Sequence, residues 1–186
     1  MLLQAAFRDL HGSRLHGFCL LVSLGDRALA GAAASDAMAR ATPKLEHLRH
    51  PERAAAWLRV TAVRSLTGKP RREPEATRRE TLRTLGVTDA AFDGLASMDV
   101  RERVAFVAAE VERLEPIDVE TILRADTGTA RRLVGHARRR YLTAAAASIG
   151  REPMTEASAP DAPPAGLTRH IEALAEAALG GTWSVR

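Results

Sequence analysis

Apolar residues in this chain recur at the spacing of an α-helix, and no stretch shows the sustained alternation with β-branched residues that is typical of a strand. Over residues 2–22 the steps are three or four residues, apart from one step of five around Gly12. The positions are Leu3, Phe7, Leu10, Leu15, Phe18, Leu21 and Val22. Apolar residues make up 46% of the chain and are mostly Ala, Leu and Val, of which Ala and Leu strongly favour helix. The sequence therefore predicts an all-α protein.

Residues 1–66 are expected to form a first helical domain. Residues 2–22 form either a helix pair or one long helix, and Gly25 suits a helix end. Asp26 suits the N-cap of a second helix, which is unusually rich in small side chains. Pro51 is well placed to open a third helix, because proline is favoured in the first helical turn.

Residues 88–149 are expected to form a second helical domain. The residues placed to cap its helices are Thr88 or Asp89, then Asp99 with Glu102 three residues on, and then Asp118. A turn over Asp126–Gly128 precedes the last helix of this domain.

The remaining segments are expected to connect or extend these domains. Residues 67–87 predict a basic linker, because they combine Gly68, Pro70 and Pro74 with many charges. From Arg64 to Arg83 the basic residues exceed the acidic ones by four, which equals the formal net charge of the whole chain. Residues 150–166 predict a Pro-rich tether. Residues 167–186 predict an amphipathic helix and a tail.

The composition excludes several function classes. One cysteine, Cys19, cannot form an internal disulfide, and the histidines offer no convincing set of zinc ligands. No run approaches the ~20 apolar residues of a membrane span, so we expect a cytoplasmic protein. No paired carboxylates, Ser-His-Asp set or glycine-rich phosphate loop stands in a supporting context. We therefore expect a non-enzymatic protein without a cofactor.

The last helix of the second domain carries five arginines and a histidine between Thr127 and Ala144. With the shorter helix before it, the stretch "VETILRADTGTARRLVGHARRRYL" fits a helix-turn-helix. Gly128 is expected in the turn with a left-handed backbone, and Thr129 as the cap. An inward stripe of Leu133, Ala137 and Tyr141 leaves a basic face outward. That face comprises Thr129, Arg131, Arg132, Gly135, His136, Arg138 and Arg139.

Such a face has two interpretations. Arginine pairs with phosphates and guanine edges, so the face predicts DNA contact. Alternatively it is an ordinary solvated surface, and the arginines and alanines reflect a GC-rich genome. The turn, the cap and the inward stripe occur together, which favours DNA binding.

Two motifs resemble the extracytoplasmic-function branch of sigma factors, the bacterial RNA polymerase subunits that recognise promoters. The family's fourth region commonly reads like "IAEILGCSVGTVKSRLHRARRRL", and here the Gly-Thr pair, the Ala-Arg-Arg-Arg run and the apolar positions fall in register. "LHGFCLLVSLGDRALAGAAASDAMARA" and "PERAAAWLRVTAVRSL" are similar to the family's second region. The similarity spans residues 2–146.

This resemblance implies the functional surfaces. Thr129, Arg131 and Arg132 match positions that contact the upstream promoter element. Trp57, Arg59 and Arg64 lie on the helix that handles the downstream element, although a lone Trp on an Ala-rich helix is more often a core residue. The helix from Leu29 to Ala41 matches the clamp on core RNA polymerase. The residues assigned to that clamp here are Leu29, Ser35, Asp36 and Arg40.

Departures from the family leave a second hypothesis open. The clamp helix of the family usually carries several acids and a Gln-Glu pair, whereas here Ser35 and Asp36 stand at the pair and Leu29, Gly31 and Ala32 replace common acids. The family's linker is usually acidic and this one is basic. The leading prediction is a sigma factor that binds core RNA polymerase and promoter DNA, with an anti-sigma factor as a further partner. The alternative is a sigma-like protein that has lost initiation and acts as a DNA-binding regulator or as a decoy for a regulatory partner.

Overall fold

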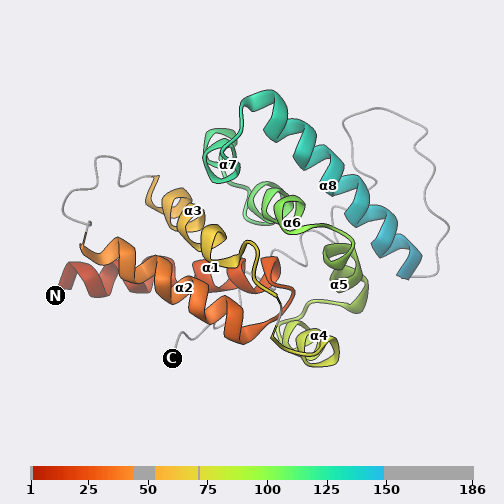
Figure 1. The fold of residues 1–186 in the computed structure, drawn as a ribbon, viewed down its shortest axis with the longest axis horizontal. Coiled ribbons are helices and arrows are strands. Elements are labelled where there is room, and N and C mark those ends of the chain that lie inside the picture. The colour runs from red at the N-terminus through yellow and green to blue at the C-terminus, as the bar shows by residue number, and fades with distance from the viewer. Residues whose placement is uncertain (1, 44–52, 71, 149–186) are drawn as a thin grey trace.

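The computed structural model describes residues 2–43, 53–70 and 72–148, and over these ranges it is all-helical (Figure 1). The predicted all-α class is thereby confirmed for these residues. The expected tether and terminal helix over 150–186, and the opening of the third helix at Pro51, lie outside the described residues.

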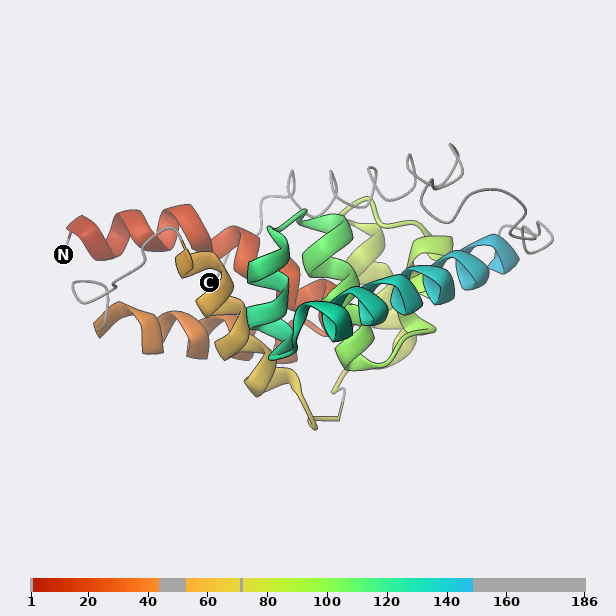
Figure 2. The same ribbon diagram turned by 90° about the horizontal axis from the view of Figure 1, so that it is seen from above.

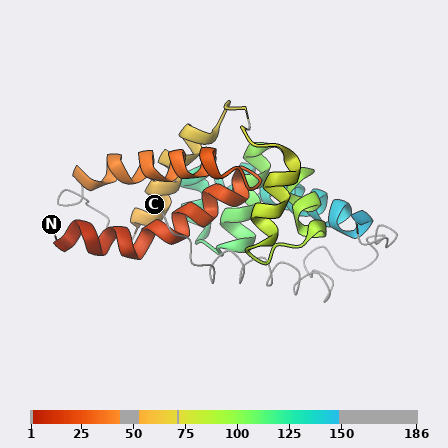
Figure 3. The same cartoon turned by 90° about the horizontal axis from the view of Figure 1, so that it is seen from below.

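Helices α1 (Leu2–Val22), α2 (Arg27–Ala41) and α3 (Ala54–Leu66) pack together at one end of the molecule (Figures 1 and 3). Of the two alternatives for residues 2–22, the structure has one long helix. It ends in a left-handed turn, with φ of 58° at Leu24 and 81° at Gly25. The Gly25 N–H donates to the Leu20 carbonyl over 2.8 Å, as in a Schellman cap. Asp26 caps α2, as predicted, by accepting the Leu29 N–H over 2.9 Å.

The stretch that we expected to be a linker contains helix α4 (Glu75–Arg83). This helix is charged, but it buries Arg78, Thr81 and Leu82. The Arg78 guanidinium donates to the carbonyls of Leu24 and Glu73. A Cβ on Gly25 would lie 2.3 Å from the Arg78 carbonyl oxygen, so α4 packs directly on the α1–α2 turn. Prolines and charges suggested an open segment, whereas the buried arginine donates both to its own segment and to the carbonyl of Leu24 on the α1–α2 turn.

Helices α5 (Asp89–Ala96), α6 (Val100–Phe106), α7 (Pro116–Leu123) and α8 (Thr127–Ser148) form the rest of the body. Thr88 caps α5, and Asp99 with Glu102 forms the predicted capping box on α6. A π-helical turn, η3 (Val107–Val111), follows α6 directly. It interrupts the α-helical hydrogen bonding that α6 begins.

Three details at the ends of α7 and α8 differ from the predictions. Asp118 does not cap α7, because the helix already begins at Pro116 and Asp118 lies in its first turn. The carboxylate of Asp126, not Thr129, accepts the free N–H at the start of α8 over 2.9 Å. The left-handed residue of the turn is Arg124, with φ of 51°, so Gly128 falls inside the first turn of α8.

The two predicted domains share one hydrophobic core. Buried apolar side chains form a continuous cluster from Leu15 and Phe18 on α1 to Phe106 and Tyr141 on α6 and α8. Helix α3 packs on α7, and α1 packs on α6 and η3 (Figure 2). The described helices of both blocks therefore form one packed body, with α8 along its far side.

Candidate nucleic-acid interface

Helices α7 and α8 are joined by the three residues 124–126 and cross steeply, as Figures 1 and 2 show. The N–H groups of Arg124 and Ala125 donate to carbonyls in the last turn of α7, which ends that helix with a left-handed residue. Asp126 then starts α8 at once. A short turn between two crossed helices is the arrangement of a helix-turn-helix.

The inner face of α8 is held along its whole length. Ala130, Ala137, Tyr141 and Ala145 are buried, and Leu133 is half-buried. The Tyr141 ring stacks on Phe106 with 4.5 Å between ring centroids. A Cβ on Gly94 would lie 2.5 Å from this ring, so glycine lets α5 approach α8 closely. The predicted inward stripe is therefore largely correct, and the packing fixes which face of α8 points outward.

The predicted basic residues of α8 lie on its outer side. The exposed ones are Arg131, Arg132, His136 and Arg139, together with Arg140, which was not among the predicted residues. Thr129 and Arg138 are half-buried. The hydroxyl of Thr129 donates to Asp126 over 2.7 Å, and Arg132 donates to that hydroxyl over 3.1 Å. The two hydrogen bonds from Thr129 hold the pKa of Asp126 below its usual value. Thr129 thus links the start of α8 to Arg132.

Carboxylates from α6 and η3 divide these basic residues into two sets. Glu102 contacts His136 Nε2 over 3.1 Å and accepts from Arg140 over 3.2 Å. Glu110 lies 3.9 Å from Arg138. Within residues 2–43, 53–70 and 72–148, no carboxylate forms an ion pair with the remaining arginines of α8. These are Arg131, Arg132 and Arg139.

The residues predicted to contact the downstream element do not form one surface. Arg64 is exposed, and Trp57 is half-buried against the core. Arg59 is buried, because its guanidinium makes two hydrogen bonds to the carboxylate of Glu112 and a third to the Ala55 carbonyl. It also lies 5.5 Å from the centre of the Phe18 ring. Arg59 is therefore a contact between the two blocks and does not lie on the surface of this structure.

The residues predicted to bind polymerase are also divided. Leu29 is buried in the core, so it presents no surface to a partner. Ser35 and Arg40 are exposed on α2. Asp36 accepts hydrogen bonds from Ser65 over 2.7 Å and from Arg40 over 2.9 Å, and these bonds lower its pKa. Asp36 thus joins α2 to α3.

The basic residues between Arg64 and Arg83 divide into two sets. Those of α4 have partners: Arg78 is buried, and Arg79 contacts Glu75 and Asp93 while its guanidinium lies 4.1 Å from the centre of the Phe92 ring. Arg83 pairs with Glu80 and Asp89. Before α4, Arg64, Lys69 and Arg72 are exposed, so the cationic surface of this stretch is confined to the residues that precede the helix.

Three glutamates of this region, Glu102, Glu110 and Glu112, were not predicted as parts of a site. The sequence did mark Glu102 as a capping residue. Its pairing with α8, and the pairing of Glu112 with Arg59 from the other block, join residues 34 or more positions apart. Local spacing carries no signal for either contact.

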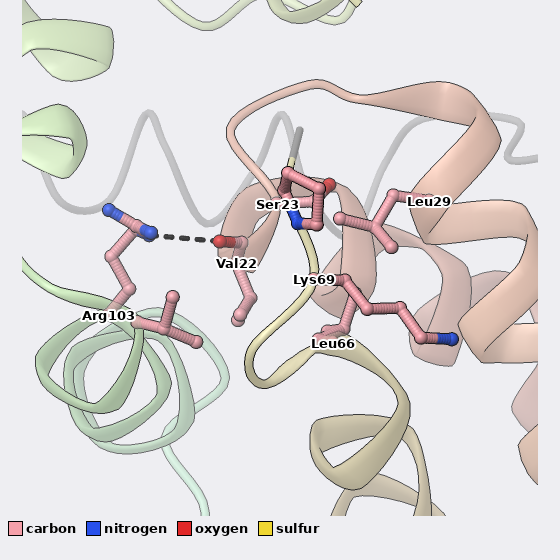
Figure 4. A pocket seen from close by; sticks show the side chains of 8 residues that line it. Val22, Ser23, Leu29, Leu66, Lys69 and Arg103 are labelled. Carbon is pink, nitrogen blue, oxygen red and sulfur yellow. Dashed lines mark hydrogen bonds between the residues drawn. The ribbon is translucent and has the colours of Figure 1, made fainter. Parts of the chain in front are cut away.

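A cavity of about 170 Å³ lies where α1, α3 and α6 meet (Figure 4). Its wall includes Val22, Leu29 and Leu66, with Lys69 at the side. The buried Arg103 guanidinium donates to the Val22 carbonyl over 2.9 Å, to the Leu95 carbonyl in the last turn of α5 and to the Met98 carbonyl after it. Arg103 thus joins α6 to the backbone at the end of α1. The cavity lies at this contact between the two blocks, and we assign it a structural role.

In the part of the chain that the structure describes, no group of three His, Cys, Asp or Glu side chains is placed to hold a metal ion. Among the same residues, no helix has both the length and the apolar character that a membrane crossing needs.

No protein-family model matches this chain, and no curated protein and no solved structure gives a significant match to it.

Proposed function

We propose that the protein binds DNA through the outer face of α8 and acts as a sigma-type initiation factor. The observation that supports DNA binding is the helix-turn-helix arrangement of α7 and α8, with three arginines of α8 left without a carboxylate among the described residues. The sigma-type role rests on the similarity of the two motifs described above.

The geometry of α8 suits a DNA groove. Arg132 and Arg139 are seven residues apart, so they lie on the same face, about 10 Å apart along the helix axis. The major groove is about 12 Å wide and admits one α-helix. Long guanidinium side chains at that spacing reach phosphates at the groove edges or guanine edges within it. Arg131 lies about 100° round the helix and suits the neighbouring backbone.

DNA binding is tested with a matched pair of triple variants. In the first, Arg131, Arg132 and Arg139 are replaced by Ala. In the second, three exposed arginines of α1 and α2, Arg8, Arg14 and Arg27, are replaced instead, which removes the same charge. Fluorescence anisotropy with a labelled duplex is measured across salt concentrations. Each lost phosphate contact should make the slope of log K against log salt less negative by about 0.9.

We expect the α8 triple variant to lose most of its affinity for DNA. Its slope of log K against log salt should become less negative by the amount that corresponds to two to three lost phosphate contacts. The control should stay close to wild type. Equal weakening of both variants would show that net charge, not the α8 face, determines binding.

Initiation is tested by in vitro transcription with purified core RNA polymerase on a library of genomic fragments. Promoter-dependent transcripts that require this protein support the sigma role. The absence of such transcripts from any template, with polymerase that is active with another sigma factor, contradicts it.

A second candidate is a DNA-binding regulator or decoy that does not initiate transcription. Two residues that the resemblance assigns to partners, Leu29 and Arg59, are buried here. The two blocks also share one hydrophobic core, and the Arg59–Glu112 ion pair joins them. Capture of core polymerase by the tagged protein supports the sigma role, whereas DNA binding without capture supports the regulator.

A further inference from the structure

We propose that Glu102 is a positioning residue that determines which basic side chains of α8 meet DNA. It holds Arg140 and His136 against the protein body and leaves Arg131, Arg132 and Arg139 as the contact set. This inference rests on the proposed DNA-binding face of α8 and names a residue outside that face.

The geometry of Glu102 suits this role. Its side chain is 7% exposed, and one carboxylate oxygen accepts the Asp99 N–H over 2.8 Å in the capping box of α6. The same carboxylate accepts from Arg140 over 3.2 Å and contacts His136 over 3.1 Å. A residue that is fixed at the start of one helix thus holds two side chains four positions apart on another helix.

The two partners of Glu102 are free to turn away from it. The Arg140 side chain is 46% exposed and that of His136 is 53% exposed. Neither fills the core, so losing the Glu102 charge would release both into solvent without opening the packed interior. The masking is therefore electrostatic and reversible.

Helix periodicity places the masked residues beside the contact face. At 100° per residue, Arg139 lies about 20° from Arg132 on one side, and His136 about 40° and Arg140 about 80° on the other. Arg138 lies on the opposite flank, where it faces Glu110. Glu102 and Glu110 thus pair with the basic residues at the two sides of the outer face. The basic charge without a carboxylate partner is limited to the arginines between them.

Narrowing the face has a consequence for selectivity. Contacts to phosphates give affinity for any sequence, whereas contacts to base edges give specificity. A released Arg140 would add a phosphate contact at the side of the groove. Glu102 therefore lowers binding to arbitrary DNA and leaves the central arginines to determine the preferred site.

The test compares Glu102→Gln with Glu80→Gln in the full chain. Gln at 102 keeps a side-chain oxygen for the capping hydrogen bond and removes the charge. Glu80 pairs with Arg83 on an exposed surface of α4, and Arg83 keeps its second partner Asp89. Both variants raise the net charge by one, so the difference between them reports release of α8 side chains.

The readout is anisotropy with a duplex of random sequence over a range of salt concentrations. We expect Glu102→Gln to bind several-fold more tightly than wild type, with a log–log salt slope more negative by about 0.9. Glu80→Gln should keep the wild-type slope. Equal slopes for the two variants would overturn the proposal.

A second variant distinguishes release of Arg140 from an effect of Glu102→Gln on folding. Arg140→Gln in the wild-type chain should leave the slope unchanged, because this arginine is already masked. Added to Glu102→Gln, it should remove the gained contact. A loss of slope from Arg140→Gln alone would mean that the arginine contacts DNA despite Glu102, and would overturn the masking.

A heparin column distinguishes failure of the masking by Glu102 from failure of the proposed DNA-binding function, because it measures accessible basic charge without DNA. If wild type binds no duplex, the proposed function fails. Later elution of Glu102→Gln than of Glu80→Gln still supports the masking, and co-elution of the two variants overturns it.

Discussion

Replacing Glu112 by Gln should lower the free energy of unfolding by about 3–5 kcal/mol, the usual effect of removing one partner of a buried ion pair. The side chains of Arg59 and Glu112 are only 4% and 6% exposed. Without the carboxylate charge, the Arg59 guanidinium keeps the Ala55 carbonyl at 2.8 Å and the face of the Phe18 ring, but no counter-charge. A full positive charge would then be buried without compensation.

The magnitude converts to a measurable change in melting temperature. For a chain of 186 residues, each kcal/mol corresponds to about 2–4 °C, so the expected decrease in Tm is roughly 6–20 °C. Thermal denaturation followed by circular dichroism, together with urea denaturation, would measure it. Glu80→Gln serves as the control, because an exposed pair such as Glu80–Arg83 contributes about 0–1 kcal/mol.

A double variant separates the pair from its packing. Arg59→Met with Glu112→Leu removes both charges and keeps apolar volume, so it should recover most of the stability that Glu112→Gln loses. If Glu112→Gln destabilises the protein by no more than the Glu80→Gln control, the two blocks are not held together by this pair in solution.

Three further predictions concern the packing and titration of single residues. Gly94→Ala should destabilise the fold by about 1–3 kcal/mol in thermal denaturation, because its Cβ would lie 2.5 Å from the Tyr141 ring; wild-type stability would mean that α5 and α8 do not pack this closely. Burial raises the pKa of Asp26, but three backbone N–H donors outweigh it and leave the pKa below its usual value. The ionised form therefore stabilises the fold above about pH 4, and this contribution is lost as the pH falls through the folded-state pKa. The difference in free energy of unfolding between wild type and Asp26→Asn should therefore shrink below about pH 4. A pH-independent difference between them would argue against this role. Burial raises the pKa of the Cys19 thiol to about 12, so a thiol reagent should label Cys19 only at the rate of unfolding; rapid labelling of the native protein would contradict the buried position.

Much of the local structure followed from local sequence. The three-to-four-residue spacing of apolar side chains gave the all-helical class, and Asp26, Thr88 and Asp99 cap helices as predicted. The inward stripe with Ala137 and Tyr141 was also correct. These features depend on hydrogen bonds and periodicity within a few residues, so their determinants lie next to one another in the chain.

The errors in capping and in the linker have a different origin. Asp118 and Thr129 were plausible caps, but Asp118 contacts Arg53 of the other block, and Asp126 begins α8 earlier. Residues 75–83 looked like a solvated segment, yet the buried Arg78 donates to the Leu24 carbonyl on the α1–α2 turn. In each case a distant partner, or a competing neighbour of similar chemistry, determined the outcome.

The amino-acid order alone was sufficient to place helices, most of their caps, and a basic outer face on the last helix of the second block. It could not show that Arg59 points into the body while Arg132 points out, since both are arginines on amphipathic helices of similar composition. Burial of a charge depends on whether a counter-charge is supplied by another element. Glu112 meets Arg59 only when the two blocks pack, and Glu102 meets Arg140 only when α6 packs on α8. The composition of the candidate interface is therefore set by long-range pairing, which no local pattern encodes.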